Sequence, residues 1–505
     1  MRCGASFCYR GNAEGVFEVT LTKIRCGGGR LKIIGRREEI YELERCEKSN
    51  KSELGCVYGR RRVGKTYLVE QTFSDYFAFR ATGVETGNTR TQLKAFGQRL
   101  KDCGDDERKI PKDWFEAFSR LEKVLKKETI RRSAHGKIIV FFDEFPWLAT
   151  AKSDFLVAFE EFWNRCGTVS RDYMFIICGS ATSWIIKNII SNTGSLYNRI
   201  TCRLFLKPFS LRETEIMFND LDFGWSRKQI VDCQMIFGGL PYFYSLMNPS
   251  ESLTWNINKL CFEEHALLQN ESKKLLEATL KKSPVYNRIM EYLSNFQYGT
   301  LKTSCQEALE IPAGTYVRAI EELTRCGYVH EYKDPYISGH PLKIQLIDPF
   351  LLFHYKFLSG DNREIYKDFN DYKRDMGRYM NWRGHSFEIL CMYHISQIKK
   401  ALGISGVHTT EYPWVSETKK DGTQIDLVID RDDGITNICE AKYTDTPFSI
   451  SADYEINLLN KMERFRQETG NKKALKLVLI SASGVSGTAH TDHVSRVLTL
   501  DDLFE

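Results

Sequence analysis

Residues 59–66 have the sequence Gly-Arg-Arg-Arg-Val-Gly-Lys-Thr, which matches the pattern of a phosphate-binding loop. Gly59 and Gly64 allow backbone N–H groups to curl round a phosphate at the start of a helix. Lys65 would reach the β and γ phosphates of ATP, and Thr66 would ligate Mg²⁺. A glycine-rich turn is the alternative, but an apolar strand before the loop and a helical pattern after it favour phosphate binding. The residues expected to line the cofactor here are Gly59, Arg60, Arg61, Arg62, Val63, Gly64, Lys65 and Thr66.

A second pattern is the apolar run Ile138–Phe142, which ends in Asp143 and Glu144. A buried strand of this kind presents Asp143 to the Mg²⁺ shell. Glu144 would then orient or deprotonate the attacking water. A strand that simply meets solvent is the alternative, and the phosphate loop upstream favours the catalytic interpretation.

Two further polar residues follow the apolar run Tyr173–Cys178. Ser180, directly after Gly179, is a candidate sensor of the γ-phosphate, and an ordinary Gly-Ser turn is almost as good an interpretation. Arg199 is a candidate arginine finger or phosphate ligand, although arginine is also common on exposed helices.

A predicted hairpin near the C-terminus brings two carboxylates and a lysine together. Glu440 and Lys442 are two apart on a strand and therefore share a face. If residues 432–434 form the loop, Asp426 lies directly opposite Glu440, which suits a Mg²⁺ site with a group to position water. A two-residue loop would move one partner to the other face. A hairpin with charged residues on its solvent side remains the alternative.

Length and composition limit the number of domains and the class of protein that can hold these residues. The chain has 505 residues, so we expect about three to five domains. It is 42% hydrophobic with a net charge of +5, which excludes bulk disorder and is compatible with nucleic acid without requiring it. No apolar run approaches the roughly 20 residues of a membrane span. The 15 scattered cysteines form no CxxC pair and indicate a reducing cytoplasm without disulfides or structural zinc.

Periodicity divides the chain into segments. Residues 31–206 alternate apolar strands with amphipathic helices, which predicts a parallel sheet covered on both faces. Helical patterns dominate residues 207–282. The order helix, helix, turn, helix, strand within Ser283–Tyr332 predicts a winged helix-turn-helix. The last segment opens with a predicted helix, Ser386–Lys400, and continues in strands.

The predicted winged helix lacks the basic face that DNA-groove readers usually show. Residues 283–334 hold five basic and seven acidic side chains, a net charge of −2. DNA contact and a structural or protein-contacting role therefore both stay open.

Five sequence boxes occur in order and resemble the archaeal-type ATPases of the AAA+/STAND group over residues 31–360. The boxes are Ile34–Glu38, residues 59–66, the strand ending at Asp143–Glu144, Cys178–Trp184 and Gly238–Pro241. The resemblance implies a P-loop core, a helical lid and a winged helix. It also implies that the Gly-Arg-x-Glu box lies near the adenine and that Pro241 contacts the nucleotide from the lid.

The C-terminal segment resembles the PD-(D/E)xK nucleases that often end such proteins. The matching residues are Glu388, Asp426, Glu440 and Lys442. The resemblance implies that the three carboxylates ligate a metal and that Asp426, Glu440 and Lys442 are catalytic. The sequence departs from the pattern because Ile425, not proline, precedes Asp426.

Together these patterns predict a cytoplasmic α/β ATPase that uses ATP and Mg²⁺, with Lys65, Glu144 and Arg199 as its catalytic residues. The expected segments are an unassigned arm (1–30), a P-loop core (31–206), a helical lid (207–282), a winged helix (283–360) and a restriction-endonuclease-like domain (382–505). The sequence leaves open whether the chain binds DNA and whether it forms a nucleotide-dependent homo-oligomer. No contact with a membrane is expected. A STAND-like signalling switch and an ATP-liganded DNA-binding regulator are the alternative functions.

Overall fold

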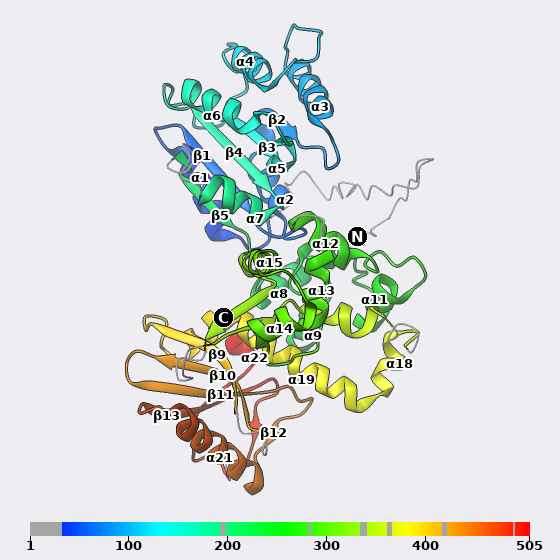
Figure 1. Ribbon diagram of the computed structural model, residues 1–505, viewed down its shortest axis with the longest axis vertical. Coiled ribbons are helices and arrows are strands. Elements are labelled where there is room, and N and C mark those ends of the chain that lie inside the picture. The colour runs from blue at the N-terminus through cyan, green and yellow to red at the C-terminus, as the bar shows by residue number, and fades with distance from the viewer. Residues whose placement is uncertain are drawn as a thin grey trace, which may run out of the picture.

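The computed structural model describes residues 33–191, 196, 199–280, 284–333, 341–360, 366–416, 422–487 and 490–505. The expected N-terminal arm, residues 1–30, lies outside the described residues. Figure 1 shows three tiers along the long axis: a first sheet with its helices, a layer of helices, and a second sheet.

The first sheet is parallel and has the strand order β2-β3-β4-β1-β5. Its strands are β1 (Glu53–Tyr58), β2 (Phe77–Thr82), β3 (Ile138–Asp143), β4 (Tyr173–Gly179) and β5 (Cys202–Phe205). The central strands β3 and β4 are buried along their whole length, as a sheet covered on both faces requires. The predicted parallel α/β sheet is confirmed.

Alternate strand residues face two separate cores. One face packs on α1 and α2, and the other packs on α3, α4 and α6. The helices of this tier are α1 (Arg37–Lys48), α2 (Lys65–Phe73), α3 (Thr89–Asp102), α4 (Trp114–Leu125), α5 (Phe145–Leu148), α6 (Phe155–Cys166) and α7 (Thr182–Ile185), with short turns at Ser74–Tyr76 and Ile186–Ile190. Because β1 and β4 are neighbours, the ends of β1, β3 and β4 meet at one edge of the sheet.

The middle tier begins with helices whose ends are capped locally. Ser210 and Ser226 start α8 and α9 through capping boxes with Glu213 and Gln229. Apolar side chains of α8 and α9 join the core that also covers the α1 face of the first sheet. The helices are α8 (Leu211–Asp220), α9 (Arg227–Phe237), α10 (Pro241–Ser245), α11 (Leu253–Ile257) and α12 (Glu271–Thr279), with a π-helical turn at Asn258–Phe262.

The next segment combines helices with a small antiparallel sheet of order β6-β8-β7. Its elements are α13 (Pro284–Leu293), β6 (Thr300–Leu301), α14 (Lys302–Leu309), α15 (Ala313–Arg325), β7 (Val329–Lys333) and β8 (Leu342–Leu346). The predicted order of helix, helix, turn, helix and strand is present. Helices α16 (Pro349–Phe353) and α18 (Phe369–Arg374) follow, with a π-helical turn at His354–Leu358.

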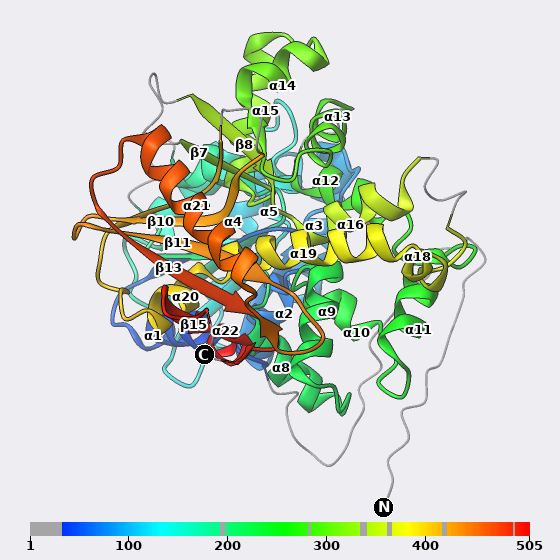
Figure 2. The same cartoon turned by 90° about the horizontal axis from the view of Figure 1, so that it is seen from below.

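The second large sheet is mixed, with the order β15-β13-β11-β10-β9. Strands β9, β10 and β11 are antiparallel neighbours, whereas β11, β13 and β15 run parallel. The connection from β11 to β13 runs through β12 and helix α21, which crosses in front of the sheet in Figure 2. Strand β12 pairs with β14, which follows β13. The elements are α19 (Met376–Tyr393), α20 (Ile395–Ala401), β9 (Thr409–Val415), β10 (Gln424–Arg431), β11 (Ile435–Lys442), β12 (Phe448–Ser449), α21 (Ala452–Thr469), β13 (Ala474–Ser481), β14 (Val485–Ser486), β15 (Val494–Leu498) and α22 (Leu500–Phe504).

The predicted single helix over Ser386–Lys400 is wrong. Two helices, α19 and α20, meet at His394, whose backbone leaves the helical region at φ −104° and ψ 26°. The buried His394 ring bonds to the Leu390 carbonyl through Nδ1 and accepts the Leu211 N–H through Nε2. The ring therefore joins the helix break to the start of α8.

Among the described residues, no helix is both long enough and apolar enough to cross a bilayer.

Candidate functional site

The phosphate loop leaves β1 at Tyr58 and enters α2 at Lys65. Gly59 has φ +148°, and a Cβ there would lie 2.4 Å from the Leu206 carbonyl oxygen. Gly64 takes the left-handed conformation, φ +90°, at the N-cap of α2. Any side chain at Gly59 would clash with backbone, so the glycines hold a loop conformation that other residues rarely adopt.

Lys65 is buried and held inside the loop. Its Nζ donates hydrogen bonds to the Arg60 carbonyl at 2.8 Å and to Ser180 Oγ at 3.0 Å. Burial lowers the pKa of Lys65, while the nearby carboxylates oppose that shift. The ammonium therefore lies between the loop and the end of β4, where phosphate oxygens would replace its two neutral acceptors.

Thr66 and Asp143 form a pair at the start of α2 and the end of β3. Thr66 Oγ1 donates to Asp143 Oδ1 and Oδ2 at 3.0 and 3.2 Å. Burial and the charge of Glu144 raise the pKa of Asp143, and the Thr66 bond acts against this rise. A hydroxyl and a carboxylate are oxygen ligands that Mg²⁺ accepts, and a cation would relieve the cost of the buried charge. These two residues therefore fit the ion.

Glu144 is held by Ser180 at the end of β4. The Ser180 N–H donates to Glu144 Oε2 at 3.0 Å, and Ser180 Oγ donates to Oε1 at 2.7 Å. Glu144 itself has φ +45°, a conformation that non-glycine residues adopt at a cost. The structure thus brings Lys65, Glu144 and Ser180 into one hydrogen-bonded chain.

The Gly-Arg-x-Glu box lies against the phosphate loop. Arg36 Nη2 donates to the Lys207 carbonyl at 2.7 Å and to the Val63 carbonyl at 3.4 Å. The Arg36 N–H donates to Glu213 on α8 at 3.3 Å. Arg36 therefore links three segments: the box, the loop and the first helix after the sheet.

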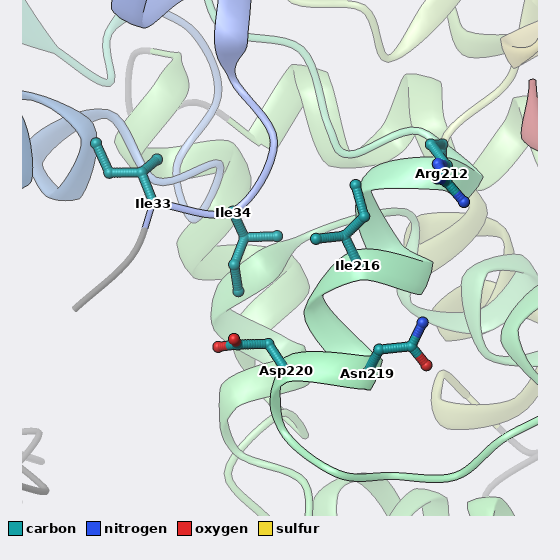
Figure 3. A pocket seen from close by; sticks show the side chains of 6 residues that line it. All are labelled: Ile33, Ile34, Arg212, Ile216, Asn219 and Asp220. Atoms are coloured by element: carbon teal, nitrogen blue, oxygen red, sulfur yellow. The ribbon is translucent and has the colours of Figure 1, made fainter. Parts of the chain in front are cut away.

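A cavity of about 360 Å³ opens beside this box (Figure 3). Ile34 and Ile216 point toward one another across it. Its wall is formed by Ile33, Ile34, Arg212, Ile216, Asn219 and Asp220. Burial and the charge of Asp220 raise the pKa of the Tyr67 hydroxyl.

Arg60 turns away from the loop and enters the segment around β8. Its Nη2 donates to Asp348 Oδ2 at 2.5 Å, and the two side chains are 2% and 0% exposed. The guanidinium lies over the Tyr328 ring, 4.5 Å from its centroid, and Nη1 lies 3.5 Å from the Tyr393 hydroxyl. A loop arginine is thus bound to elements that follow it by almost three hundred residues.

Arg62 contacts the middle tier in the same manner. Its Nε donates to Glu271 at 2.9 Å, and its guanidinium lies 3.8 Å from the Tyr242 ring centroid. Neither Arg60 nor Arg62 therefore directs its guanidinium into the space above the loop. Their expected contribution to nucleotide binding rests on their backbone.

Arg199 and Pro241 occupy separate positions. Arg199 lies in a short turn just before β5, half-buried, and its N–H bonds to the Leu196 carbonyl at 3.0 Å. Pro241 is the first residue of α10 and follows two left-handed glycines, Gly238 and Gly239. A Cβ at Gly239 would lie 2.4 Å from the Phe209 carbonyl oxygen, so this turn approaches the end of the first sheet closely.

The C-terminal hairpin has the strand register that a three-residue loop at residues 432–434 predicts. Leu427 pairs with Cys439 and Asp430 with Thr436. Extending this register by one residue places Asp426 opposite Glu440, and Asp426 Oδ2 accepts the Ala441 N–H at 2.9 Å. The predicted register is confirmed, and directly opposed side chains share a face.

Glu440 is bound by two lysines. Lys442 Nζ donates to Glu440 at 2.9 Å, and Lys461 of α21 reaches both carboxylate oxygens at 2.8 and 3.0 Å. The Tyr454 hydroxyl donates a further bond at 2.9 Å. Burial would raise the pKa of Glu440, but Lys442 and Lys461 outweigh it and lower that pKa.

Asp426 and Glu388 lie close to Glu440. Burial raises the pKa of Asp426 well above its ordinary value, and the charges of Glu440 and Glu388 add to this rise. Among the described residues, however, no three His, Cys, Asp or Glu side chains form a group that could hold a metal ion. Glu388, Asp426 and Glu440 therefore do not fit the metal that the sequence analysis assigned to them.

Sequence reasoning missed the partners that come from distant segments. Asp348, Lys461 and Glu271 lie in ordinary helical or turn contexts that carry no motif. Gln297, which donates to both carboxylate oxygens of Glu388, belongs to a loop that looks like any polar connection. Ile33 and Ile34, which precede the Gly-Arg-x-Glu box, were the only sequence feature from which the cavity could have been predicted.

Comparison with known proteins identifies the first part of the chain. Residues 33–244 match a family described as an ATPase domain predominantly from Archaea. An uncharacterized ATP-binding protein of Methanocaldococcus jannaschii is 46% identical over 43 residues, which are 8% of this chain and 73% of that protein. The chain belongs to this family. The archaeal ATPase segment thus covers the first sheet and ends within α10, and membership implies that it binds ATP.

Other proteins are similar to this archaeal-type ATPase over a larger share of its chain. A second uncharacterized protein of Methanocaldococcus jannaschii is 21% identical over 373 residues, which are 73% of this chain and 78% of that protein. The Walker-type ATPase of Pyrococcus abyssi is 16% identical with a TM-score of 0.46, over 64% of this chain and 96% of that one. The ORC2 protein of Aeropyrum pernix is 14% identical with a TM-score of 0.40, over 68% and 95%.

Proposed function

We propose that this archaeal-type ATPase hydrolyses ATP with Mg²⁺ at the edge where β1, β3 and β4 end. The observation that carries the proposal is the hydrogen-bonded set of Lys65, Thr66, Asp143, Glu144 and Ser180 around a glycine-shaped loop. The set combines a cation for phosphates, oxygen ligands for a metal and a carboxylate for water. Phosphoryl transfer requires these parts and little covalent chemistry.

The cavity beside the Gly-Arg-x-Glu box suits the base of the nucleotide. Its volume of about 360 Å³ lies at the lower end of the range for ligand pockets. Ile33, Ile34 and Ile216 offer apolar surface to a planar ring, and Asn219 and Asp220 offer polar groups at its edge. Pro241, on the turn that approaches the sheet, is proposed to contact the nucleotide from the middle tier.

Hydrolysis requires side chains to exchange partners within the set. Phosphate oxygens would draw Lys65 away from the Arg60 carbonyl, since a charged acceptor binds an ammonium more strongly than a neutral one. Bound Mg²⁺ would supply charge neutralisation at the phosphates, with Thr66 and Asp143 as its protein ligands. Glu144 would leave Ser180 to orient and deprotonate the attacking water, and Ser180 would then face the γ-phosphate. Arg199 is proposed as an additional phosphate contact.

We propose that ATP turnover controls the segments that follow the ATPase. The element order from α13 to β8 supports a winged helix, and the buried Arg60–Asp348 pair connects it directly to the phosphate loop. The hairpin bearing Asp426, Glu440 and Lys442 supports a nuclease-like C-terminal domain that contacts DNA. A STAND-like switch is the second candidate, because both loop arginines hold neighbouring segments against the loop.

A steady-state phosphate-release assay on the full chain tests the proposal, with Mg²⁺ and with or without plasmid DNA. Lys65→Ala should abolish ATP binding in a calorimetric titration, because Lys65 is the cation that the loop places at the β and γ phosphates. Lys187→Ala, a lysine in the short turn after α7, is a control that should bind ATP normally. Retained ATP affinity in Lys65→Ala would refute the site. DNA-stimulated turnover favours the DNA-coupled enzyme, and slow turnover indifferent to DNA favours the switch.

A further inference from the structure

Helices α9, α11, α18 and α19 line a second cavity, of about 200 Å³. Helix α11 packs on α18, α18 on α19, and α19 on α9. The cavity therefore lies where the archaeal ATPase segment, which includes α9, meets the helices that precede the second sheet. It shares no residue with the phosphate loop or with the cavity beside the Gly-Arg-x-Glu box, so any ligand here would be separate from the nucleotide.

Lys373 of α18 brings an ammonium group to this cavity. Its Nζ donates to Thr254 Oγ1 of α11 at 2.5 Å and lies 5.1 Å from the Phe369 ring centroid. Within the described parts of the chain, Lys373 forms no ion pair with a carboxylate. Burial lowers the pKa of Lys373, and the charge of Asp232 opposes that shift. The ammonium and the Thr254 hydroxyl can therefore bind an anionic group together.

Asp232 of α9 brings a carboxylate to the same cavity. Its Oδ1 accepts the Tyr443 hydroxyl at 2.9 Å and lies 3.8 Å from Arg383 Nε. Its Oδ2 accepts no hydrogen bond from any residue that the structure describes. Burial raises the pKa of Asp232, and Arg383 opposes that rise. A cationic group can therefore bind Oδ2 without displacing Tyr443.

The lining suits a ligand that carries both charges and an apolar group. Lys373 and Asp232 line one cavity without pairing with each other, and a molecule of a single charge would leave one of them without a partner. Ile236, Phe369 and Trp382 are buried and offer apolar surface to the remainder of the ligand. The volume equals that of roughly seven water molecules and lies below the range for drug-sized ligands, so the ligand must be small.

We propose that this cavity binds a free α-amino acid with an apolar side chain. The ammonium group of the amino acid binds Asp232 Oδ2, and its carboxylate binds Lys373 Nζ and the Thr254 hydroxyl. Its side chain packs against Phe369 and Trp382. Hydrogen bonds between charged groups are the strong ones, so the two ionic contacts determine which class of molecule binds.

The test is a calorimetric titration of L-leucine into the full chain, beside two analogues that each lack one charge. One analogue is 3-methylbutylamine, which has no carboxylate, and the other is 4-methylpentanoate, which has no ammonium group. We expect leucine to bind at least about tenfold more tightly than either analogue, the scale of one hydrogen bond to a charged group.

Two variants assign the charges to their residues. Lys373→Met should weaken leucine binding at least about tenfold and abolish the preference for leucine over 3-methylbutylamine. Asp232→Asn keeps an acceptor for Tyr443 and should abolish the preference for leucine over 4-methylpentanoate. Lys259→Met is the matched control, because Lys259 lies in the π-helical turn after α11 and pairs with Glu263 at 2.7 Å. It should leave leucine binding unchanged.

The unaltered chain decides the proposal even where a variant fails to fold. Absence of leucine binding at roughly 10 mM, or equal affinity for leucine and both analogues, overturns the amino-acid site. Full leucine affinity in either folded variant, Lys373→Met or Asp232→Asn, shows that leucine binds elsewhere and overturns it as well.

Discussion

Replacing Asp348 with asparagine isolates the buried ion pair between the phosphate loop and the segment that follows β8. Asp348 Oδ2 accepts a bond from Arg60, and its Oδ1 accepts the Leu351 N–H at the start of α16. Asparagine has one acceptor oxygen in its side chain. The variant can therefore cap the helix or face the arginine, and its amide N–H₂ must meet the donor that remains.

The expected loss follows from the burial of both partners. Arg60 is 2% exposed and Asp348 is fully buried, so the variant leaves a guanidinium without its counter-charge and out of contact with water. Breaking such a pair from one side costs about 3–5 kcal/mol. Since 1.36 kcal/mol corresponds to a factor of ten, the opening equilibrium of α16 should increase at least roughly a hundredfold.

Amide hydrogen exchange in residues 350–353 of α16 measures this opening locally. A local measurement is needed because a chain of several domains seldom unfolds in one step. Asp113→Asn is the matched control: Asp113 caps α4 through the Glu116 N–H, and asparagine caps equally well. It should change exchange in α4 by less than about fivefold. Arg60→Met/Asp348→Asn should recover most of the lost protection, because no buried charge is then left without a partner and asparagine still caps α16. If Asp348→Asn changes exchange no more than Asp113→Asn does, the buried pair does not hold these segments together.

Three further predictions concern the ATPase site and the helix junction. Glu144→Gln should retain ATP binding but slow steady-state hydrolysis by at least ~10²-fold, the usual scale of losing a general base, and unchanged turnover would assign that role elsewhere. Asp143→Asn should weaken nucleotide binding in the presence of Mg²⁺ but not in EDTA; equal losses in both titrations would contradict its role as a metal ligand. Burial lowers the pKa of His394 to about 4. The unfolded chain, with an ordinary histidine pKa near 6.5, binds the proton first, so stability should fall as the pH drops from about 6.5 to 4, by up to about 3 kcal/mol. The apparent thermal midpoint should fall less steeply over that range in His394→Gln, and parallel pH profiles would argue against this linkage.

Local patterns allowed the parallel sheet and the ATPase loop to be predicted. Burial on both faces makes β3 and β4 continuous apolar runs, and these were found with nearly correct bounds. In the two five-stranded sheets the missed strands lie at the edges: β5 has four residues, and β15 alternates irregularly between buried and exposed positions. An edge strand is half-covered and short, so its sequence resembles a loop.

The helix junction at His394 shows a different limit. The periodicity from Ser386 to Lys400 continues through the junction and contains no proline or glycine. At the break, the His394 ring accepts the N–H of Leu211, 183 residues earlier in the chain. No local propensity signals such a bond.

The sequence by itself determined the features built from neighbouring residues: the loop of residues 59–66 and the strand that delivers Asp143 and Glu144. Each depends on backbone conformation or on a turn, and these forces act within a few residues. Only the tertiary structure decided where Arg60 binds and which side chain donates to Glu388. The Arg60–Asp348 contact spans 288 positions. The energies of such contacts come from desolvation and charge pairing between segments that meet only after the tiers have packed, so the partners carry no mark in the local sequence.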